Sequence, residues 1–410
     1  MRLAIILIIY IAVCAAALAN LYGPLKRALC PERRSAFGGA AGPSRRKKWP
    51  VRLVLGILLV LLSFPALGAM LPDGQAGYFF QRWGNVFIGY LLYFSVPLLL
   101  IWMVLLIVRF VYRRRKREKW RPRRFHSAAL IVVLLVGTVI INICGAQTAH
   151  NVRVTSYEIP KEQLGQTEPL RIVLVGDLHI GVNSNIKLYE DMVDRINEQD
   201  PDLVLVAGDL VTSAFGAMED PDAYAEVMRG IDAKYGTYVV YGNHDVEEPL
   251  FGGFTYEPAS KAERNPGMQP WINACGWQLL TDETITLPEL NGLVLAGRRD
   301  EKRPGDGVKE RMSLDELFAD VDPDAPILLL EHEPVELVEL QDYGIDLTVC
   351  GHTHDGQIFP GNVWGRIHDP QSYGMKNWGD STVVVTSGVG FYGPPIRVGT
   401  ISEIVVIDAK

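Results

Sequence analysis

The sequence predicts a chain in two parts: four membrane-spanning helices over residues 1–150 and a layered α/β domain over residues 151–410. The first observation is charge, because residues 1–150 hold 21 Lys and Arg against 3 Asp and Glu, whereas residues 151–410 hold 19 against 44. The second is hydropathy, because long apolar runs dominate the first part and short apolar segments alternate with amphipathic ones in the second. Parts this different are expected to lie in different solvents.

The first part contains four apolar stretches, at about residues 3–22, 52–71, 86–110 and 127–146. Each is close to the ~20 residues that a helix needs to cross a hydrocarbon core. Their only charged residues, Arg52 and Arg109, lie at the ends. Buried core helices are rarely this long or separated by basic loops, so we predict an integral membrane protein with four spans.

The positions of Lys and Arg predict the orientation of the chain. The connections at residues 26–48 and 113–124 are strongly basic, whereas the connection between the second and third stretches carries only Arg82 and Asp73. Basic loops remain on the cytoplasmic side, so residues 151–410 are expected on the extracytoplasmic side. The alternative is that residues 1–19 are a cleaved signal peptide, which would leave three spans and export both basic loops.

The second part is expected to be an α/β domain. Continuously apolar segments, typical of strands buried on both faces, alternate with helical segments at residues 186–199 and 222–234. We predict an edge strand at residues 151–157 and further strands at 171–176, 202–208, 237–241, 293–296, 326–330, 345–349, 382–386 and 403–407. The acidic balance of this part argues against a nucleic-acid partner, because phosphate backbones need a basic surface.

Residues that can bind metal directly follow five of these strands. Because the carboxyl ends of strands gather at one edge of an α/β sheet, we expect these side chains to lie together. A lone His after a strand is more often a polar core residue, and Gly-Asn-His-Asp also favours a turn, but five such strand ends do not arise readily by chance. The residues are Asp177 and His179; Asp209; Asn243, His244 and Asp245; His332, between Glu331 and Glu333; and His352 with His354.

The mixture of side chains predicts the kind of metal. Carboxylate, imidazole and amide oxygen together suit borderline divalent ions such as Mn²⁺, Fe²⁺ or Zn²⁺. The set holds more ligands than one tetrahedral ion needs, so we predict two ions bridged by a carboxylate. Such a pair polarises a phosphoryl group and lowers the pKa of a bound water.

The ordered set of motifs resembles the calcineurin-like metallophosphoesterase superfamily over about residues 170–410. Residues 351–357 and 393–397 are similar to the membrane-associated branch that includes the bacterial YkuE and YaeI proteins. The resemblance implies an αββα sandwich with two β-sheets. It also implies that the first metal is held by Asp177, His179 and His354, the second by Asn243, His332 and His352, with Asp209 bridging the two.

The resemblance assigns His244 a catalytic role beside the phosphate, where it stabilises the transition state or protonates the leaving oxygen, with Asp245 orienting its ring. The chain departs from the branch at Asp355, where Gly is usual, and an added carboxylate there would affect a bound water or the substrate. Glu331 and Glu333 would raise the pKa of His332 if they faced it. The simpler expectation is that both point to solvent.

We therefore expect a membrane-anchored phosphoesterase, in which a metal-bridging hydroxide attacks a phosphodiester, pyrophosphate or phosphomonoester. A phosphorylated small molecule or an envelope lipid would be the substrate. One alternative is a non-catalytic receptor that binds a phosphorylated ligand through its metals. Another is a channel or transporter, although the spans lack the internal charges that such proteins use. Cys275 and Cys350 share one domain, but we do not predict a disulfide between them.

Overall fold

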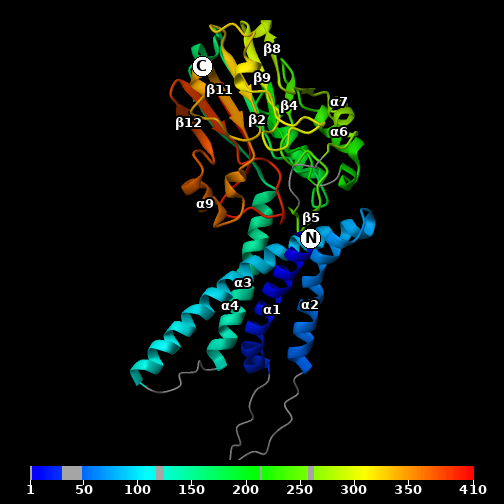
Figure 1. Cartoon of the computed structure of the whole chain (residues 1–410), viewed down its shortest axis with the longest axis vertical. Coiled ribbons are helices and arrows are strands. Elements are labelled where there is room, and N and C mark those ends of the chain that lie inside the picture. Colours follow the sequence, from blue (N-terminus) through cyan, green and yellow to red (C-terminus); the bar gives the residue numbers. More distant parts are fainter. Residues whose placement is uncertain (1, 30–48, 117–123, 213–214, 257–262) are drawn as a thin grey trace, which may run out of the picture.

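The structure, a computed structural model, describes residues 2–29, 49–116, 124–212, 215–256 and 263–410 (Figure 1). One end of the molecule is a helical bundle of α1 (Arg2–Leu29), α2 (Trp49–Met70), α3 (Gln75–Lys116) and α4 (Arg124–Ala149). Among the described residues, these four helices are long and apolar enough to cross a membrane. The predicted membrane region with four spans is therefore confirmed.

The orientation prediction rests mainly on basic residues at 30–48 and 117–123, which lie outside the described residues. The helix ends that flank both segments lie at the end of the bundle away from the α/β domain (Figure 1). The even number of spans that the prediction needs is thus present in the described chain.

Helix α3 differs most from its prediction. It begins at Gln75, well before the apolar stretch 86–110. The prediction missed these first turns because they include polar residues such as Gln81 and Arg82, which a search for apolar stretches leaves out. A helix of 42 residues is about 63 Å long, roughly twice the thickness of a hydrocarbon core. Figure 1 shows α3 inclined within the bundle, with its first turns beneath the α/β domain.

The described part of the α/β domain contains two six-stranded sheets, in the orders β1-β14-β2-β3-β4-β7 and β12-β13-β11-β10-β9-β8. The central strands of each sheet are parallel, whereas β8, β12 and β14 each have an antiparallel neighbour. The strands are β1 (Val152–Ile159), β2 (Leu170–Val175), β3 (Leu203–Ala207), β4 (Thr237–Val240), β7 (Gln278–Leu279), β8 (Glu283–Leu287), β9 (Leu293–Gly297), β10 (Ile327–Leu330), β11 (Ile345–Cys350), β12 (Gly374–Trp378), β13 (Ser381–Val385) and β14 (Ser402–Ala409).

The two sheets pack face to face, and alternate residues of each strand point to opposite sides. In β3, Leu203 and Leu205 point into the core between the sheets, whereas Val204 points to the outer face. In β10, Leu328 points to the same inner core and Leu329 points outward. Burial on both faces explains why these strands read as continuous apolar runs in the sequence.

Helices cover both outer faces. The first sheet is covered by α5 (Ile186–Asn197), α6 (Pro221–Arg229) and α7 (Met268–Ala274), and the second by α8 (Leu314–Leu317) and the turn Leu340–Tyr343. The predicted αββα sandwich is confirmed. The helix predicted at 222–234 ends at Arg229, where Gly230 caps it. Cys275 and Cys350 are free, buried thiols on the outer faces of different sheets.

The α/β domain rests directly on the bundle. The backbone N–H of Arg397 donates to the carbonyl of Gly145 in α4 at 2.9 Å. Arg82 in α3 donates to the carbonyl of Val182 at 2.5 Å. Near the amino terminus, the ring of Tyr10 contacts Phe251 of the hairpin formed by β5 (Leu250–Phe251) and β6 (Phe254–Thr255), with ring centroids 5.0 Å apart. Helix α2 also contacts β5, so all four membrane helices touch the domain.

Candidate metal centre

The predicted ligands converge at the carboxyl ends of five strands, as the sequence indicated. Strands β2, β3 and β4 of the first sheet and β10 and β11 of the second each end immediately before one of the motifs. The side chains form two groups, and the possible ligand atoms of each group lie within 4.8 Å of one another. The first group is Asp177, His179 and His354, and the second is Asp209, His332 and His352.

The first group joins the two sheets. Nε2 of His179 lies 3.0 Å from Nε2 of His354, and Nε2 of His354 lies 3.6 Å from Oδ1 of Asp177. The other ring nitrogen of His179 contacts Oγ1 of Thr212 at 2.7 Å. A hydrogen bond at that nitrogen fixes the ring and leaves Nε2 facing the group, which is the arrangement of a metal-binding imidazole.

The second group includes Asn243. Its Oδ1 lies 2.9 Å from Nε2 of His332 and 2.8 Å from Nδ1 of His352. Nδ1 of His332 donates to the carbonyl of Ala207 at 2.6 Å, so Nε2 faces the group. An amide oxygen and two imidazole nitrogens converging on one point form a donor set suited to a borderline divalent ion.

Asp209 lies between the two groups. Its Oδ2 is 3.5 Å from Nε2 of His179 and 3.1 Å from Nε2 of His332, so one carboxylate oxygen faces a ligand of each group. The side chain is 1% exposed. A buried carboxylate at this position fits a bridging ligand of two ions.

The backbone at the site is strained. Asp177, His179, Asp209, His352 and His354 all have φ between +48° and +73°, a region that costs a non-glycine residue about 1–3 kcal/mol. Gly208, just before Asp209, has φ +75°, and a Cβ there would lie 2.5 Å from the backbone nitrogen of Gly242. Packing between neighbouring strand ends therefore holds the ligands in conformations that an isolated chain avoids.

Burial and neighbouring carboxylates together set the pKa values of the imidazoles. Burial lowers the pKa of His179 to about 3 and that of His352 to about 4, so both rings are neutral and able to bind metal. At His332 burial also disfavours the charged ring, but the carboxylates of Asp209, Asp177 and Asp300 together outweigh it and raise the pKa. Burial would raise the pKa of Asp209, but the neighbouring rings of His332, His244 and His179 hold it below its usual range.

His244 lies beside the two groups, but its partner is not the predicted one. Nδ1 of His244 contacts Oε1 of Glu248 at 2.5 Å. The Asp245 carboxylate instead accepts hydrogen bonds from the backbone of Leu210, Val211 and Gly242 at 2.7–3.0 Å. The prediction that Asp245 orients the His244 ring is therefore wrong, because three backbone N–H groups already engage that carboxylate.

Glu248 is in turn fixed by Arg303, which pairs with its second oxygen and donates to the backbone carbonyl of Asn243 at 2.8 Å. Burial disfavours a charged His244, but the carboxylates of Asp209 and Glu248 outweigh it and raise the pKa of His244. A raised pKa keeps a proton on the ring, as a proton donor requires.

The expectation that Glu331 and Glu333 point to solvent is also wrong. Glu331 is fully buried and pairs with Arg311 at 3.0 Å. Glu333 pairs with Lys302 at 2.5 Å, and its other oxygen lies 3.7 Å from Nε2 of His352. The cations come from residues 298–311, whose approach to these acids the sequence does not reveal.

Asp355 does not face the metal groups. Its carboxylate forms a two-pronged ion pair with Arg366, with the shorter contact at 2.8 Å. The expected effect of this residue on a bound water or on the substrate therefore finds no support in its contacts.

Sequence reasoning missed other residues near the site. The ring of Tyr392 lies 4.3 Å from that of His244, and Nη2 of the fully buried Arg397 lies 3.4 Å from Nδ1 of His354. Arg397 closes the Gly-Pro-Pro-Ile-Arg segment noted in the sequence, but a motif alone does not reveal that a side chain is buried. Glu248 and Arg303 belong to none of the motifs noted in the sequence.

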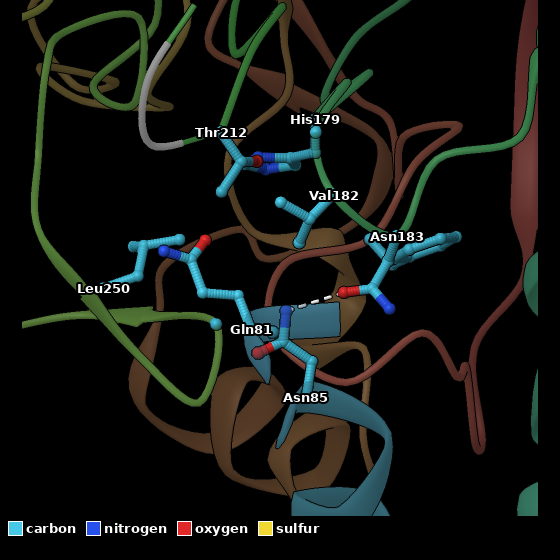
Figure 2. Close-up of a pocket in the computed structure, with 11 residues that line it drawn as sticks. Gln81, Asn85, His179, Val182, Asn183, Thr212 and Leu250 are labelled. Carbon is cyan, nitrogen blue, oxygen red and sulfur yellow. Dashed lines mark hydrogen bonds between the residues drawn. The ribbon is translucent and has the colours of Figure 1, made fainter. Parts of the chain in front are cut away.

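A narrow pocket separates the site from α3. Figure 2 shows Gln81 and Asn85 of α3 on one side of it and His179 and Thr212 on the other. Its volume of about 20 Å³ suffices for roughly one water-sized group. An adjacent cavity of about 360 Å³ lies where the α2–α3 connection meets residues 247–250, and Gln81 and Leu250 line both spaces. The membrane region thus forms one wall beside the candidate centre.

Residues 170–356 match the family model described as calcineurin-like phosphoesterase. Over these residues the α/β domain is similar to this family. The matched residues include every predicted ligand.

Individual relatives agree with this similarity. The chain is 28% identical over 284 residues to a transmembrane protein with metallophosphoesterase domain of Danio rerio, covering 68% of this chain and 62% of that protein. It is 28% identical over 310 residues to an uncharacterized metallophosphoesterase of Campylobacter jejuni, covering 75% of each. It is 27% identical over 278 residues to the uncharacterized metallophosphoesterase YkuE of Bacillus subtilis, covering 64% of this chain and 86% of that protein. The predicted similarity to the YkuE-like branch is confirmed.

The contact between His244 and Glu248 leads to a prediction. Replacing Glu248 by Ala frees the His244 ring, and we expect kcat for a phosphodiester to fall by about 10–100-fold with KM little changed. Glu248→Gln keeps a hydrogen-bond acceptor at the same place, so it should retain more activity than Glu248→Ala. Steady-state kinetics of the full-length variants measures both.

Asp245→Ala is the matched control, because Asp245 is adjacent to His244 but bonds the backbone. We expect it to lower the apparent Tm, which Glu248→Ala should not do to the same extent. If Asp245→Ala lowered kcat strongly with an unchanged Tm, and Glu248→Ala left kcat unchanged, Asp245 and not Glu248 would be the residue that orients His244.

Proposed function

We propose that the protein is a membrane-anchored phosphoesterase that uses two divalent ions to hydrolyse a phosphodiester, a pyrophosphate or a phosphomonoester. One observation carries the proposal: Asp209 lies between two buried groups of imidazole and carboxylate ligands, and His244 lies at their edge. A receptor would need the ligands but not a proton donor held by its own carboxylate.

The residues divide naturally between two ions. Asp177, His179 and His354 would hold the first, and Asn243, His332 and His352 the second, with Asp209 shared. The donor set fits Mn²⁺, Fe²⁺ or Zn²⁺. When bound, two such ions polarise the phosphoryl group and lower the pKa of a water between them.

The protein's own residues would complete the reaction. His244, protonated and held by Glu248, would donate its proton to the leaving oxygen as the bond from phosphorus to that oxygen breaks. The backbone N–H of His244 donates to Oδ1 of Asp209 at 2.7 Å, which ties the position of the ring to the bridging carboxylate. A hydroxide derived from water would attack phosphorus from the opposite side, so that a new bond from phosphorus to oxygen forms as the bond to the leaving oxygen breaks.

The substrate class we favour is a phosphate ester at the membrane surface, such as an envelope lipid or a lipid-linked intermediate. The support is the shared wall: Gln81 and Asn85 of α3 line the pocket that reaches His179, and Asn85 is only 4% exposed. Asn85 donates to Oδ1 of Asn183 at 2.6 Å, while its own Oδ1 is buried without a hydrogen-bond partner in the described part of the chain. Such an acceptor suits a hydroxyl of a head group.

We place the α/β domain on the extracytoplasmic side. The support is the positive-inside rule applied to the basic connections, together with the four described spans. The packing of α1 argues against a cleaved signal peptide, because Tyr10 donates to the carbonyl of Leu62 at 2.8 Å and also contacts the α/β domain.

Hydrolysis is tested with the full-length protein loaded with Mn²⁺ and a chromogenic phosphodiester. We expect metal-dependent release of the chromophore, and a loss of at least about 100-fold in Asp209→Ala, because both metal positions share that carboxylate. Equal rates for the two proteins would contradict the proposal, and so would unchanged activity after chelation.

The orientation is tested separately by adding protease to intact cells that express the protein. Residues 151–410 should be degraded without lysis, whereas a cytoplasmic marker should survive. Protection of this domain until the membrane is permeabilised would reverse the assignment.

A further inference from the structure

Helix α9 (Gly361–His368) and the residue Phe359 before it carry large apolar side chains that the described residues of the α/β domain leave exposed. Ile367 is 70% exposed and Trp364 66%, and Phe359 and Val363 are about half exposed. A contiguous patch of this kind on a soluble surface usually marks a contact with a partner or a membrane. We propose that this face, defined by Phe359, Val363, Trp364 and Ile367, lies in the surface of the bilayer that the chain spans.

The helix is amphipathic in the sense that membrane docking requires. Val363, Trp364 and Ile367 recur at helical spacing, so they share one side. The other side holds Asn362 and Gly365, which are buried against the domain. Trp364 stacks on His368 with ring centroids 3.7 Å apart, and Trp is the residue most typical of the interface between lipid and water. One face is thus committed to the protein and the other is free.

Contacts with the membrane helices identify the occupant of the free face. The hydroxyl of Tyr93, in α3, donates to the carbonyl of Phe359 at 3.1 Å. Tyr93 lies seven residues into the apolar stretch 86–110, which is about 10 Å along the helix axis. Helices that lie in a membrane surface insert their apolar faces by about 5–10 Å, and the contact with this stretch of α3 brings Phe359 to the predicted lipid boundary.

The arrangement of the whole molecule agrees with this depth. Figure 1 shows α9 on the side of the α/β domain that faces the membrane helices. The segment around Ile396 packs on the bundle as well. The side chain of Ile396 lies so close to Gly89 of α3 that a Cβ added to Gly89 would meet it at 3.2 Å. The exposed face is therefore continuous with the apolar part of α3 that is predicted to span the membrane, which favours the bilayer over a separate protein partner.

Helix α9 is also tied to the candidate metal centre. Arg366 pairs with Asp355, the next residue after His354, and Asn362 donates to the carbonyl of Gly399 at 3.0 Å. Thr400 donates to the backbone carbonyl of His354 at 3.1 Å. Contact with the bilayer would thus hold the loop that carries His354, and it gives the carboxylate of Asp355 a role as the link between α9 and that loop.

Photolabelling tests the contact without reference to activity. The full-length protein is placed in phosphatidylcholine nanodiscs that contain a phospholipid with a diazirine in its acyl chain, and adducts are mapped by mass spectrometry after irradiation. We expect adducts on residues 359–368, as on α4. The double variant Trp364→Ser/Ile367→Ser should reduce them by about tenfold, because its face no longer enters the lipid, while the labelling of α4 stays unchanged.

The matched control is Val338, which is 61% exposed on the same domain, and whose peptide should remain unlabelled. Both substituted residues are largely exposed, so the variant should keep its fold, and the labelling of α4 reports its insertion. Labelling of 359–368 no greater than that of the Val338 peptide would overturn the proposal. The proposal would also be overturned if the parent protein buried this face in a dimer that the double variant does not form.

Discussion

The structure depends on one buried carboxylate. Asp209 follows β3, near the middle of the first sheet, and its two oxygens face His179, His332 and the backbone of His244. A carboxylate this deep is costly unless it is paired. Residues from both sheets meet around it: His179 and His244 follow strands of the first sheet, and His332 follows β10 of the second. The sandwich must therefore pack in one register for this charge to be compensated, which links the stability of the fold to the geometry of the candidate centre.

Much of this could be predicted from the sequence, because strands buried on both faces appear as continuous apolar runs and the ligands follow them directly. The apolar run before Asp177 and the one before Asp209 each marked a strand and its carboxyl end. The membrane helices were equally clear from length and hydropathy. The edge strands β7, β8 and β12 and the helix α9 were not predicted, since the strands are short or polar and α9 has only about two turns.

The errors have a common physical cause. Asp245, Glu331 and Glu333 were interpreted from their sequence neighbours, yet their partners come from distant segments: the backbone of Leu210, and the side chains of Arg311 and Lys302. Glu248, which holds His244, is four residues away in a stretch without regular structure. A motif specifies which residues can bind a metal. It does not specify which buried groups neutralise or orient them, because that depends on the tertiary contacts of loops.

The central claim is that one carboxylate organises two metal positions, and the metal content of the purified protein tests it most directly. Full-length protein and Asp209→Asn are loaded with Mn²⁺ in parallel, freed of excess metal and analysed by inductively coupled plasma mass spectrometry. The account predicts about two ions per chain in the parent protein and at most about one in the variant, with the fold retained. One ion or none in the parent protein, or two held equally well without the Asp209 carboxylate, would contradict it.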